Sequence, residues 1–237
     1  MKNFYVLTIF LFPLCLLGQI IGDEEIDTNK LTSWNTSEIN TYAGVYFFGF
    51  SESESKLFLS VHDSIIDAQL QYYSWNNGDE KIQGWIPTFK NYTNVQIIDN
   101  KFYSKESNGE FVVYENRKYL KLDNPPLQEG EEESFYELGA LSDDDYFKFI
   151  SGDYNDTKFT VLPEKYLKSL SSKELKIVRN EIYARYGYIF NPGGEMSLYF
   201  NSKEWYKGIY KNVDKFITQI EKRNIAFIKK AEEIRKQ

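Results

Sequence analysis

Apolar and polar residues alternate in short runs between residues 34 and 126. The segments Lys56–Val61 and Asn94–Ile98 show this period of two, which is typical of strands that bury one face. Candidate hairpin turns at Asn76–Asp79 and Ser107–Glu110 separate such runs, and the second leads into the strand-like segment Phe111–Tyr114. We therefore predict roughly six to eight short strands in an antiparallel β-meander, or a small barrel or sandwich.

The strand pattern stops at Asn124–Pro126, because neither proline can donate a hydrogen bond to a sheet. Ten acidic residues and one basic residue, Lys148, lie between positions 128 and 156. Such a charge run is typical of solvent-exposed chain. We predict an acidic connector over residues 127–160, with one short helix near Tyr146–Ile150, between the β-rich domain at 34–126 and a second domain at 161–237.

The second domain shows helical spacing. Ser171 stands three residues before Glu174, a capping box that predicts the start of a helix, and Gly187 is a natural helix stop. The apolar stripe of this helix consists of Leu175, Val178, Ile182 and Tyr186. Thr218 and Glu221 predict a second capping box. The inward stripe of this last helix is predicted to be Ile220, Phe227, Ala231 and Ile234. The predicted fold class is therefore α+β.

The run Arg179–Gly187 resembles the signature of the YARHG domain, which is named after its Tyr-Ala-Arg-His-Gly motif. The similarity covers roughly Leu162 to Ile234. It continues through Tyr188–Phe190, Tyr199–Phe200, Trp205–Tyr206, Glu221–Lys222 and Asn224. The resemblance implies a small helical module of bacterial extracytoplasmic proteins, and the family has no assigned biochemical function.

Tyr186 occupies the position of the motif histidine. A tyrosine, whose usual pKa is about 10, cannot replace an imidazole that titrates near neutrality. Since Tyr186 falls within the apolar stripe, we expect it to pack in the core and to offer one polar atom, with acid-base chemistry as the alternative.

The signature supplies the candidate binding or motif residues. They are Arg179, Asn180, Glu181, Tyr183, Arg185, Tyr186, Trp205 and Tyr206. Arg179, on the flank of the stripe with Tyr183, is interpreted either as an anion receptor or as the partner of a carboxylate or of a helix end. Glu181 and Arg185 have the spacing of an ion pair on a helix surface. Trp205 and Tyr206 belong to an aromatic cluster that either fills the core or stacks on a glycan or peptide.

The N-terminus predicts a signal peptide over residues 1–19. Lys2 precedes the apolar run Phe4–Leu17, which Pro13 interrupts and which is shorter than the roughly 20 residues of a membrane-spanning helix. A retained anchor and a lipoprotein at Cys15 are the alternatives. Residues 20–33 form a predicted N-terminal extension, and no later segment is apolar enough to span a membrane. Because Cys15 is the only cysteine, cleavage leaves no thiol.

Composition and missing motifs exclude several functions. With 28 basic and 35 acidic residues, and a net charge of −7, nucleic acid is an unfavourable partner. In a strand, His62 and Ser64 point to one face and Asp63 to the other, so these three residues alone cannot form a Ser-His-Asp relay. His62 is the only histidine and cleavage leaves no cysteine, so a zinc site lacks ligands, and no EF-hand or phosphate-binding loop occurs. We predict no catalytic residue, metal or cofactor.

We therefore predict an exported bacterial protein, located in the periplasm, on the outer surface or outside the cell. It acts as a non-catalytic binding or scaffolding module for an envelope component, protein or glycan. The alternative is a hydrolase of envelope glycan or peptide, because paired carboxylates are all that such an enzyme requires. A purely structural partner of another envelope protein is the third interpretation.

Overall fold

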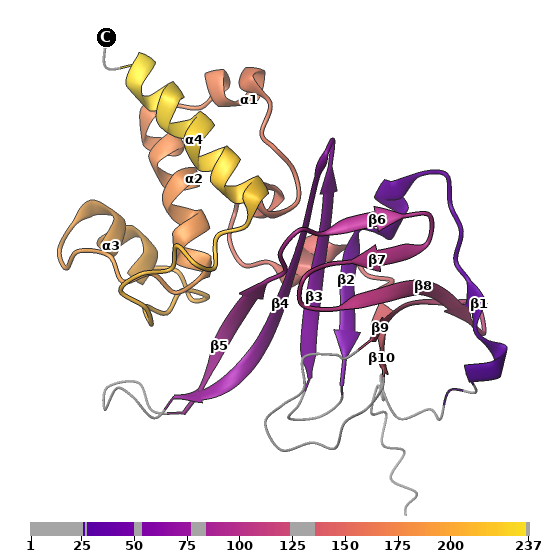
Figure 1. Ribbon diagram of the computed structural model, residues 1–237. Coiled ribbons are helices and arrows are strands. Elements are labelled where there is room, and N and C mark those ends of the chain that lie inside the picture. The colour runs from indigo at the N-terminus through magenta and orange to yellow at the C-terminus, as the bar shows by residue number, and fades with distance from the viewer. Residues whose placement is uncertain (1–25, 27, 50–53, 77–83, 124–135, 236–237) are drawn as a thin grey trace, which may run out of the picture.

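A computed structural model describes residues 26, 28–49, 54–76, 84–123 and 136–235 (Figure 1). Within these ranges a ten-stranded antiparallel sheet precedes a helical part, so the predicted α+β class is confirmed. The predicted signal peptide at 1–19 and Cys15 lie outside the described residues. No helix in the described part of the chain is long and apolar enough to cross a membrane.

The sheet consists of two meanders. The strands are β1 (Thr32–Ser33), β2 (Gly44–Phe48), β3 (Ser55–His62), β4 (Ile65–Asn76), β5 (Gly84–Asn91), β6 (Gln96–Ile98), β7 (Lys101–Tyr103), β8 (Asn108–Tyr114), β9 (Arg117–Asp123) and β10 (Tyr136–Leu141). Their order is β5-β4-β3-β2-β10-β9-β8-β7-β6, and β1 pairs with β8. The meander β2–β5 therefore joins the meander β6–β10 through the pair of β2 and β10.

The turn predicted at Ser107–Glu110 lies slightly earlier in the chain. Asn108 and Gly109 already belong to β8, and the Ser104 hydroxyl closes the turn by donating to the Ser107 carbonyl at 2.6 Å. Gly109 is required within the strand because a Cβ there would lie 2.4 Å from the carbonyl oxygen of Lys121. The glycine thus serves close strand packing, whereas the sequence pattern favoured a turn.

The main core lies where the two meanders face each other. In Figure 1 the strands β6–β8 run across the steep strands β2 and β3. The buried cluster between them is strongly aromatic, with the rings of Tyr42 and Phe111 stacked at 4.1 Å. The hydroxyl of Tyr42 donates to the Trp34 carbonyl at 2.9 Å, and that of Tyr46 donates to the Tyr42 carbonyl at 2.6 Å. Each buried phenol therefore has a hydrogen-bond partner.

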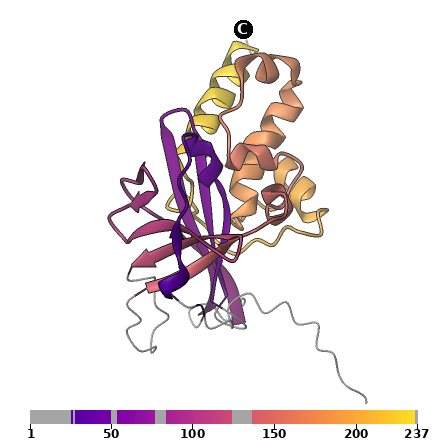
Figure 2. The same cartoon turned by 90° about the vertical axis from the view of Figure 1, so that its right-hand side faces the viewer.

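The second face of β3 and β4 carries the helical part, which lies beside these strands in both views (Figures 1 and 2). Successive side chains of a strand point to opposite faces. In β4, Ala68 and Leu70 enter the main core, while Asp67 and Gln69 bond to the helical part. The alternation in β4 thus places apolar side chains on one face and polar side chains on the other. Both sets are buried.

The acidic segment at 127–160 is more structured than the predicted connector. Its described part contains β10, which pairs with β2 and β9 inside the sheet, and two 3-10 helices, η4 (Tyr146–Phe149) and η5 (Asn155–Lys158). Aromatic residues of η4 pack against Phe58 and Phe159. The high charge count concealed these apolar residues, although the short helix predicted near residues 146–150 is present.

The helices are α1 (Glu164–Ser169), α2 (Ser172–Arg185), α3 (Glu195–Asn201) and α4 (Gln219–Ile234), and a shorter 3-10 helix, η2, spans Ile39–Tyr42. Both predicted capping boxes are confirmed. The stripe of α2 is buried as predicted. The stripe predicted for α4 is wrong in part, because Ile220 is buried but Phe227 and Ile234 are exposed. The buried side of α4 contains Glu221 and Asn224, which a hydrophobic pattern does not detect.

Candidate functional site

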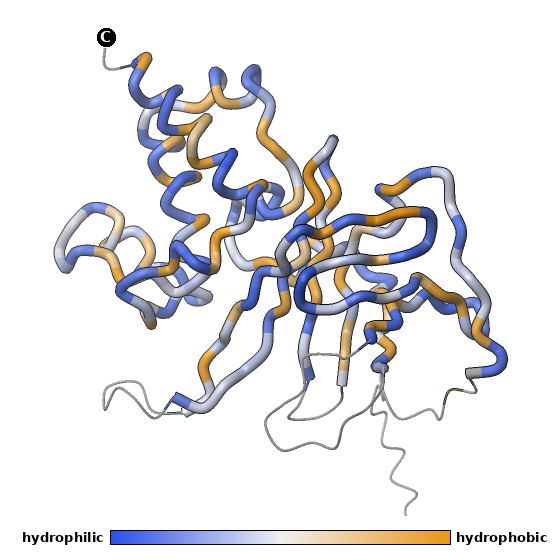
Figure 3. Tube along the Cα trace, viewed as in Figure 1, coloured by the Kyte–Doolittle hydropathy of each residue, from blue (hydrophilic) through white to orange (hydrophobic). Residues whose placement is uncertain are grey.

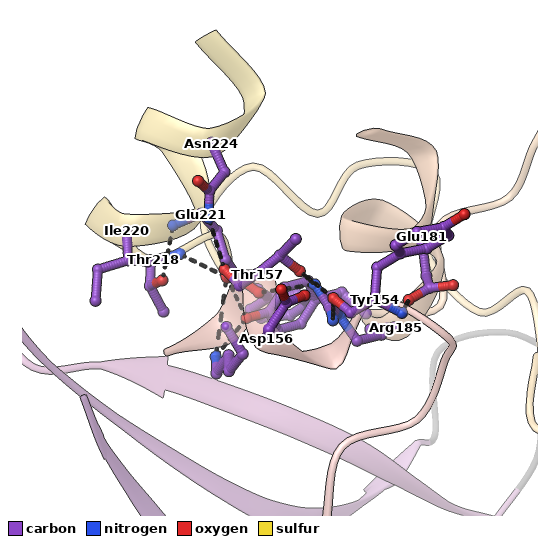
Figure 4. Close-up of polar contacts among 12 residues, drawn as sticks. Tyr154, Asp156, Thr157, Glu181, Arg185, Thr218, Ile220, Glu221 and Asn224 are labelled. Carbon is purple, nitrogen blue, oxygen red and sulfur yellow. Dashed lines mark hydrogen bonds and ion pairs between the residues drawn. The ribbon is translucent and has the colours of Figure 1, made fainter. Parts of the chain in front are cut away.

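A buried polar cluster lies between the sheet and the helices. Its members are Gln69 on β4, Lys158 at the end of η5, Arg185 and Tyr186 at the end of α2, and Glu221 in the first turn of α4. Figure 4 shows Arg185, Thr157 and Glu221 converging from these helices above the sheet. Four separate segments of the chain therefore meet at one point.

Tyr186 is at the centre of this polar cluster. Its ring packs edge-on against Phe89 at 4.8 Å and is buried, as its place in the α2 stripe predicts. Its hydroxyl donates to Glu221 Oε2 at 2.6 Å and accepts from Lys158 Nζ at 2.6 Å. Burial, reinforced by the negative charge of Glu221, raises the pKa of Tyr186 well above its usual value. The phenol therefore remains protonated at neutral pH.

Lys158 has only 4% of its surface exposed. Its ammonium donates to Gln69 Oε1 at 2.5 Å and to the Tyr186 hydroxyl, and it lies 3.8 Å from Glu221 Oε2. Burial lowers the pKa of Lys158 to about 8, against the opposing attraction of Glu221. Sequence reasoning missed Lys158 and Gln69, since neither belongs to a motif and only the fold brings them together.

Glu221 has two roles. As the third residue of α4 it accepts from the backbone amide of Thr218 at 3.0 Å, which completes the capping box. The same carboxylate accepts from Tyr186 and lies 3.7 Å from Arg185. Glu221 Oε1 and Arg185 Nε have no hydrogen-bond partner within the described ranges. The sequence revealed the capping role only.

The predicted surface ion pair of Glu181 and Arg185 is wrong. Glu181 is fully buried and accepts from the backbone amides of Asp153 and Tyr154 at 3.0 and 2.7 Å. Burial raises the pKa of Glu181, while the charge of Arg185 opposes the shift. Arg185 donates to the Tyr154 carbonyl at 3.1 Å and to the Thr157 hydroxyl at 2.5 Å. The partners of both Glu181 and Arg185 thus lie in the segment from Asp153 to Thr157. The sequence had predicted that these two side chains pair with each other at the solvent-exposed surface.

The other residues of the α2 signature make local contacts. Arg179 forms a bidentate pair with Glu232 of α4, at 2.9 and 3.2 Å. Of the two predicted roles of Arg179, this contact corresponds to the partner of a carboxylate. Asn180 donates to the Lys176 carbonyl at 2.7 Å. Tyr183 is half-buried in the core of the helical part. These three residues are not members of the polar cluster.

Trp205 and Tyr206 lie in a separate aromatic cluster. Both are half-buried and pack against Phe200, with ring centroids 6.0 and 5.8 Å away. The Tyr206 hydroxyl donates to the Tyr188 carbonyl at 2.6 Å. The sequence left two interpretations open, core packing and stacking on a glycan or peptide. These contacts correspond to core packing.

A cavity of about 80 Å³ opens at the polar cluster. Lys158, Arg185, Tyr186 and Glu221 line it, together with Gln71 and Phe89 of the sheet. This volume is large enough for a few water molecules, the usual partners of unpaired buried atoms such as those of Glu221 and Arg185. Among the described residues, no group of three or more His, Cys, Asp or Glu side chains is placed to hold a metal ion.

Residues 149–233 match the family model of the YARHG domain. We therefore refer to this matched segment, residues 149–233, as the YARHG domain. It begins before residue 161, the predicted boundary, so η5 and Lys158 belong to it. The YARHG domain therefore supplies every member of the polar cluster except Gln69. YARHG domains are typical of extracytoplasmic proteins of unassigned function. Searches of curated proteins and of solved structures found no significant match.

The close contact between Gly152 and Glu181 generates a first prediction. A Cβ at Gly152 would lie 2.3 Å from Glu181 Oε1, whereas a Cβ at Gly84 has no neighbour within 4 Å among the residues that the structure describes. Both glycines have nearly the same φ, +113° and +118°. We expect Gly84→Ala to lose about 1–2 kcal/mol in unfolding free energy and Gly152→Ala about 1–3 kcal/mol more. Urea denaturation of both variants measures the difference, and equal losses would refute the contact.

Removing the central hydroxyl tests the polar cluster. We expect Tyr186→Phe to lower the unfolding free energy by about 2–3 kcal/mol, because Lys158 and Glu221 both lose a buried partner. Tyr206→Phe is the matched control and should cost only about 1 kcal/mol, since it loses one hydrogen bond to a carbonyl. Denaturant titration of both variants measures these losses. If Tyr186→Phe loses no more unfolding free energy than Tyr206→Phe, the Tyr186 hydroxyl does not stabilise the polar cluster.

The lowered pKa of Lys158 predicts a pH dependence. The folded protein releases this proton near pH 8, whereas the unfolded chain retains it until about pH 10.5. Since the unfolded state binds more protons in this window, the contribution of Lys158 to stability rises with pH from about 8 to 10. We expect the unfolding free energy of the wild type relative to Lys158→Met to increase by more than about 1 kcal/mol across it. Denaturant titration of both proteins at each pH measures this difference. If their unfolding free energies change in parallel with pH, the pKa of Lys158 is not lowered.

Proposed function

We propose that the protein is a non-catalytic binding module of the bacterial cell envelope, and that its ligand is an uncharged region of an envelope glycan. The observation that carries this proposal is an aromatic strip formed by Tyr73, Trp75 and Trp85. Their exposed fractions are 52%, 55% and 56%. Exposed aromatic residues gathered on one face are typical of interaction sites.

Strand register places the aromatic strip on a single face of the β4–β5 hairpin. Trp75 and Trp85 are direct cross-strand partners, and Tyr73 is two residues from Trp75 in β4. Residues two apart in a strand share a face, as do cross-strand partners. The sequence indicated an aromatic cluster near Trp205 but does not reveal this hairpin, because the hydropathy pattern of the hairpin resembles that of an ordinary strand.

The same face carries the YARHG domain at its other end. Asp67 and Gln69 bond to this domain, and Phe89 packs on Tyr186. Tyr73 and Trp75 continue this series along β4, beyond the part that the domain covers. The β4–β5 hairpin projects away from the helices in Figure 1. The aromatic strip is thus the uncovered continuation of an interdomain surface.

The chemistry of the aromatic strip favours a sugar. Aromatic faces attract polarised C–H groups, which the faces of sugar rings provide. The side chains of the strip and of the neighbouring Pro87 carry no charge, so the surface offers nothing specific to a polyanion. The Trp75 and Trp85 rings meet at 83° with centroids 5.8 Å apart, and each retains an accessible surface.

A hydrolase with paired carboxylates gains no support from two cavities in the described part of the chain. The cavity at the polar cluster has Glu221 as its one carboxylate, and a groove beside α1 has Glu164. Glycoside hydrolysis by this route requires two carboxyl groups on either side of the bond. The non-catalytic proposal therefore agrees better with these sites.

Sedimentation with purified peptidoglycan sacculi tests the proposed function. We expect the chain from residue 20 onward to co-sediment, and Trp75→Ala or Trp85→Ala to weaken binding about tenfold through loss of stacking area. Tyr103→Ala, which removes an exposed aromatic residue of β7, is the control and should bind like the wild type.

A thermal melt of each variant separates binding from folding. A cross-strand tryptophan pair contributes only about 0.2–1 kcal/mol to a sheet, so the tryptophan variants should stay folded. The proposal fails if the wild type does not bind sacculi, or if the tryptophan variants bind as well as Tyr103→Ala.

A further inference from the structure

Helix α4 leaves an apolar stripe uncovered. Phe227 and Ile234 are 39% and 61% exposed, and Ala231 lies between them at helical spacing. Ile225 and Ile228 are buried in the core of the YARHG domain, and Ile220 is buried in the first turn of the helix. Figure 3 shows apolar positions interspersed among hydrophilic ones along α4. The helix therefore has a second apolar face that the rest of the described chain leaves open.

This stripe forms one wall of a groove between α4 and α1. Leu167 of α1 contributes the facing apolar surface, and the volume is about 300 Å³. That size is near the lower end of the range for small-molecule sites, roughly 300–1,000 Å³. The groove therefore has room for a slender apolar chain and too little for a packed helix.

The rim of the groove is cationic. Lys168, Lys230 and Arg235 stand around it with Glu164, which gives three positive charges and one negative charge, or +2. Glu164 is already paired with Lys168 at 2.6 Å. Arg235 donates to the carbonyls of Leu167 and Lys168 at 3.3 and 3.0 Å, which fixes its guanidinium at the groove. This local charge is opposite to the net charge of the whole chain, −7.

We propose that the groove binds a single-chain anionic amphiphile, of the chemical class of a free fatty acid. The apolar chain lies against Leu167, Phe227, Ala231 and Ile234, and the carboxylate faces Lys230 and Arg235. An apolar wall removes the chain from water, while a cationic rim favours an anionic head group over a neutral one. The groove is concave and lies between helices, so it offers neither a free strand edge to a peptide nor a broad face to a membrane.

Titration with dodecanoate, below the concentration at which it forms micelles, tests the proposal. We expect saturable binding to the chain from residue 20 onward by isothermal calorimetry. Lys230→Glu should weaken binding at least about tenfold by placing a carboxylate at the rim. Lys229→Glu makes the same charge change one position away on α4, outside the groove lining, and should bind within about twofold of the wild type.

A second variant tests the apolar wall. Ala231→Phe fills the groove and should abolish dodecanoate binding, and an unchanged melting temperature shows that the domain remains folded. Dodecanol, which lacks the charge, should bind at least about tenfold more weakly than dodecanoate. Binding to sacculi and its loss in Trp75→Ala should be independent of dodecanoate, so the two proposals fail separately.

Three results overturn this inference. The first is the absence of saturable binding by the wild type. The second is equal weakening by Lys230→Glu and Lys229→Glu, which would indicate nonspecific attraction. The third is binding to vesicles of anionic phospholipid without binding to monomeric dodecanoate, which would indicate a membrane surface as the ligand.

Discussion

Strand β4 is buried on both faces where the YARHG domain covers it, and the face toward the domain carries polar side chains. Asp67, Gln69 and Asn91 point toward the YARHG domain, where unpaired polar groups would be costly. Each finds a complementary group on the domain, and Gln69 also receives the ammonium of Lys158. Both hydrogen bonds and apolar packing therefore hold the domain on the sheet. Hydrogen bonds are directional and so specify its position more closely than apolar packing does.

These bonds also orient α4. Asp67 accepts from the backbone amide of Ile220 in the first turn of the helix, at 2.7 Å. Asn91 donates to the carbonyls of Lys215 and Ile217 just before it, at 3.1 and 3.2 Å. With its beginning held in this way, α4 turns Glu221 and Asn224 inward and Phe227 outward. The open groove beside α1 is thus linked to polar contacts at the opposite end of the helix.

Local chemistry allowed part of this structure to be predicted from the sequence. Both capping boxes and the stripe of α2 follow from short-range rules, and these elements are present. The orientation of α4 could not be predicted, because its buried side is partly polar. The strand β10 was concealed by its acidic surroundings. In the polar cluster, the family signature identified Arg185 and Tyr186, while Gln69 and Lys158 could be recognised only after long-range contacts had formed.

The pairing of β2 with β10 has a consequence for how the chain acquires its structure. Residues near position 47 in β2 pair with residues near position 140 in β10. The middle of the sheet therefore forms only through contacts between residues that are distant in sequence. Such topologies fold slowly, and an unpaired strand is prone to associate with other chains in the interval. When the chain emerges from its N-terminus, as in synthesis, the first meander has an open edge until more than half of the polypeptide has appeared. A chaperone that shields β2 during this period would protect the protein at its most vulnerable stage.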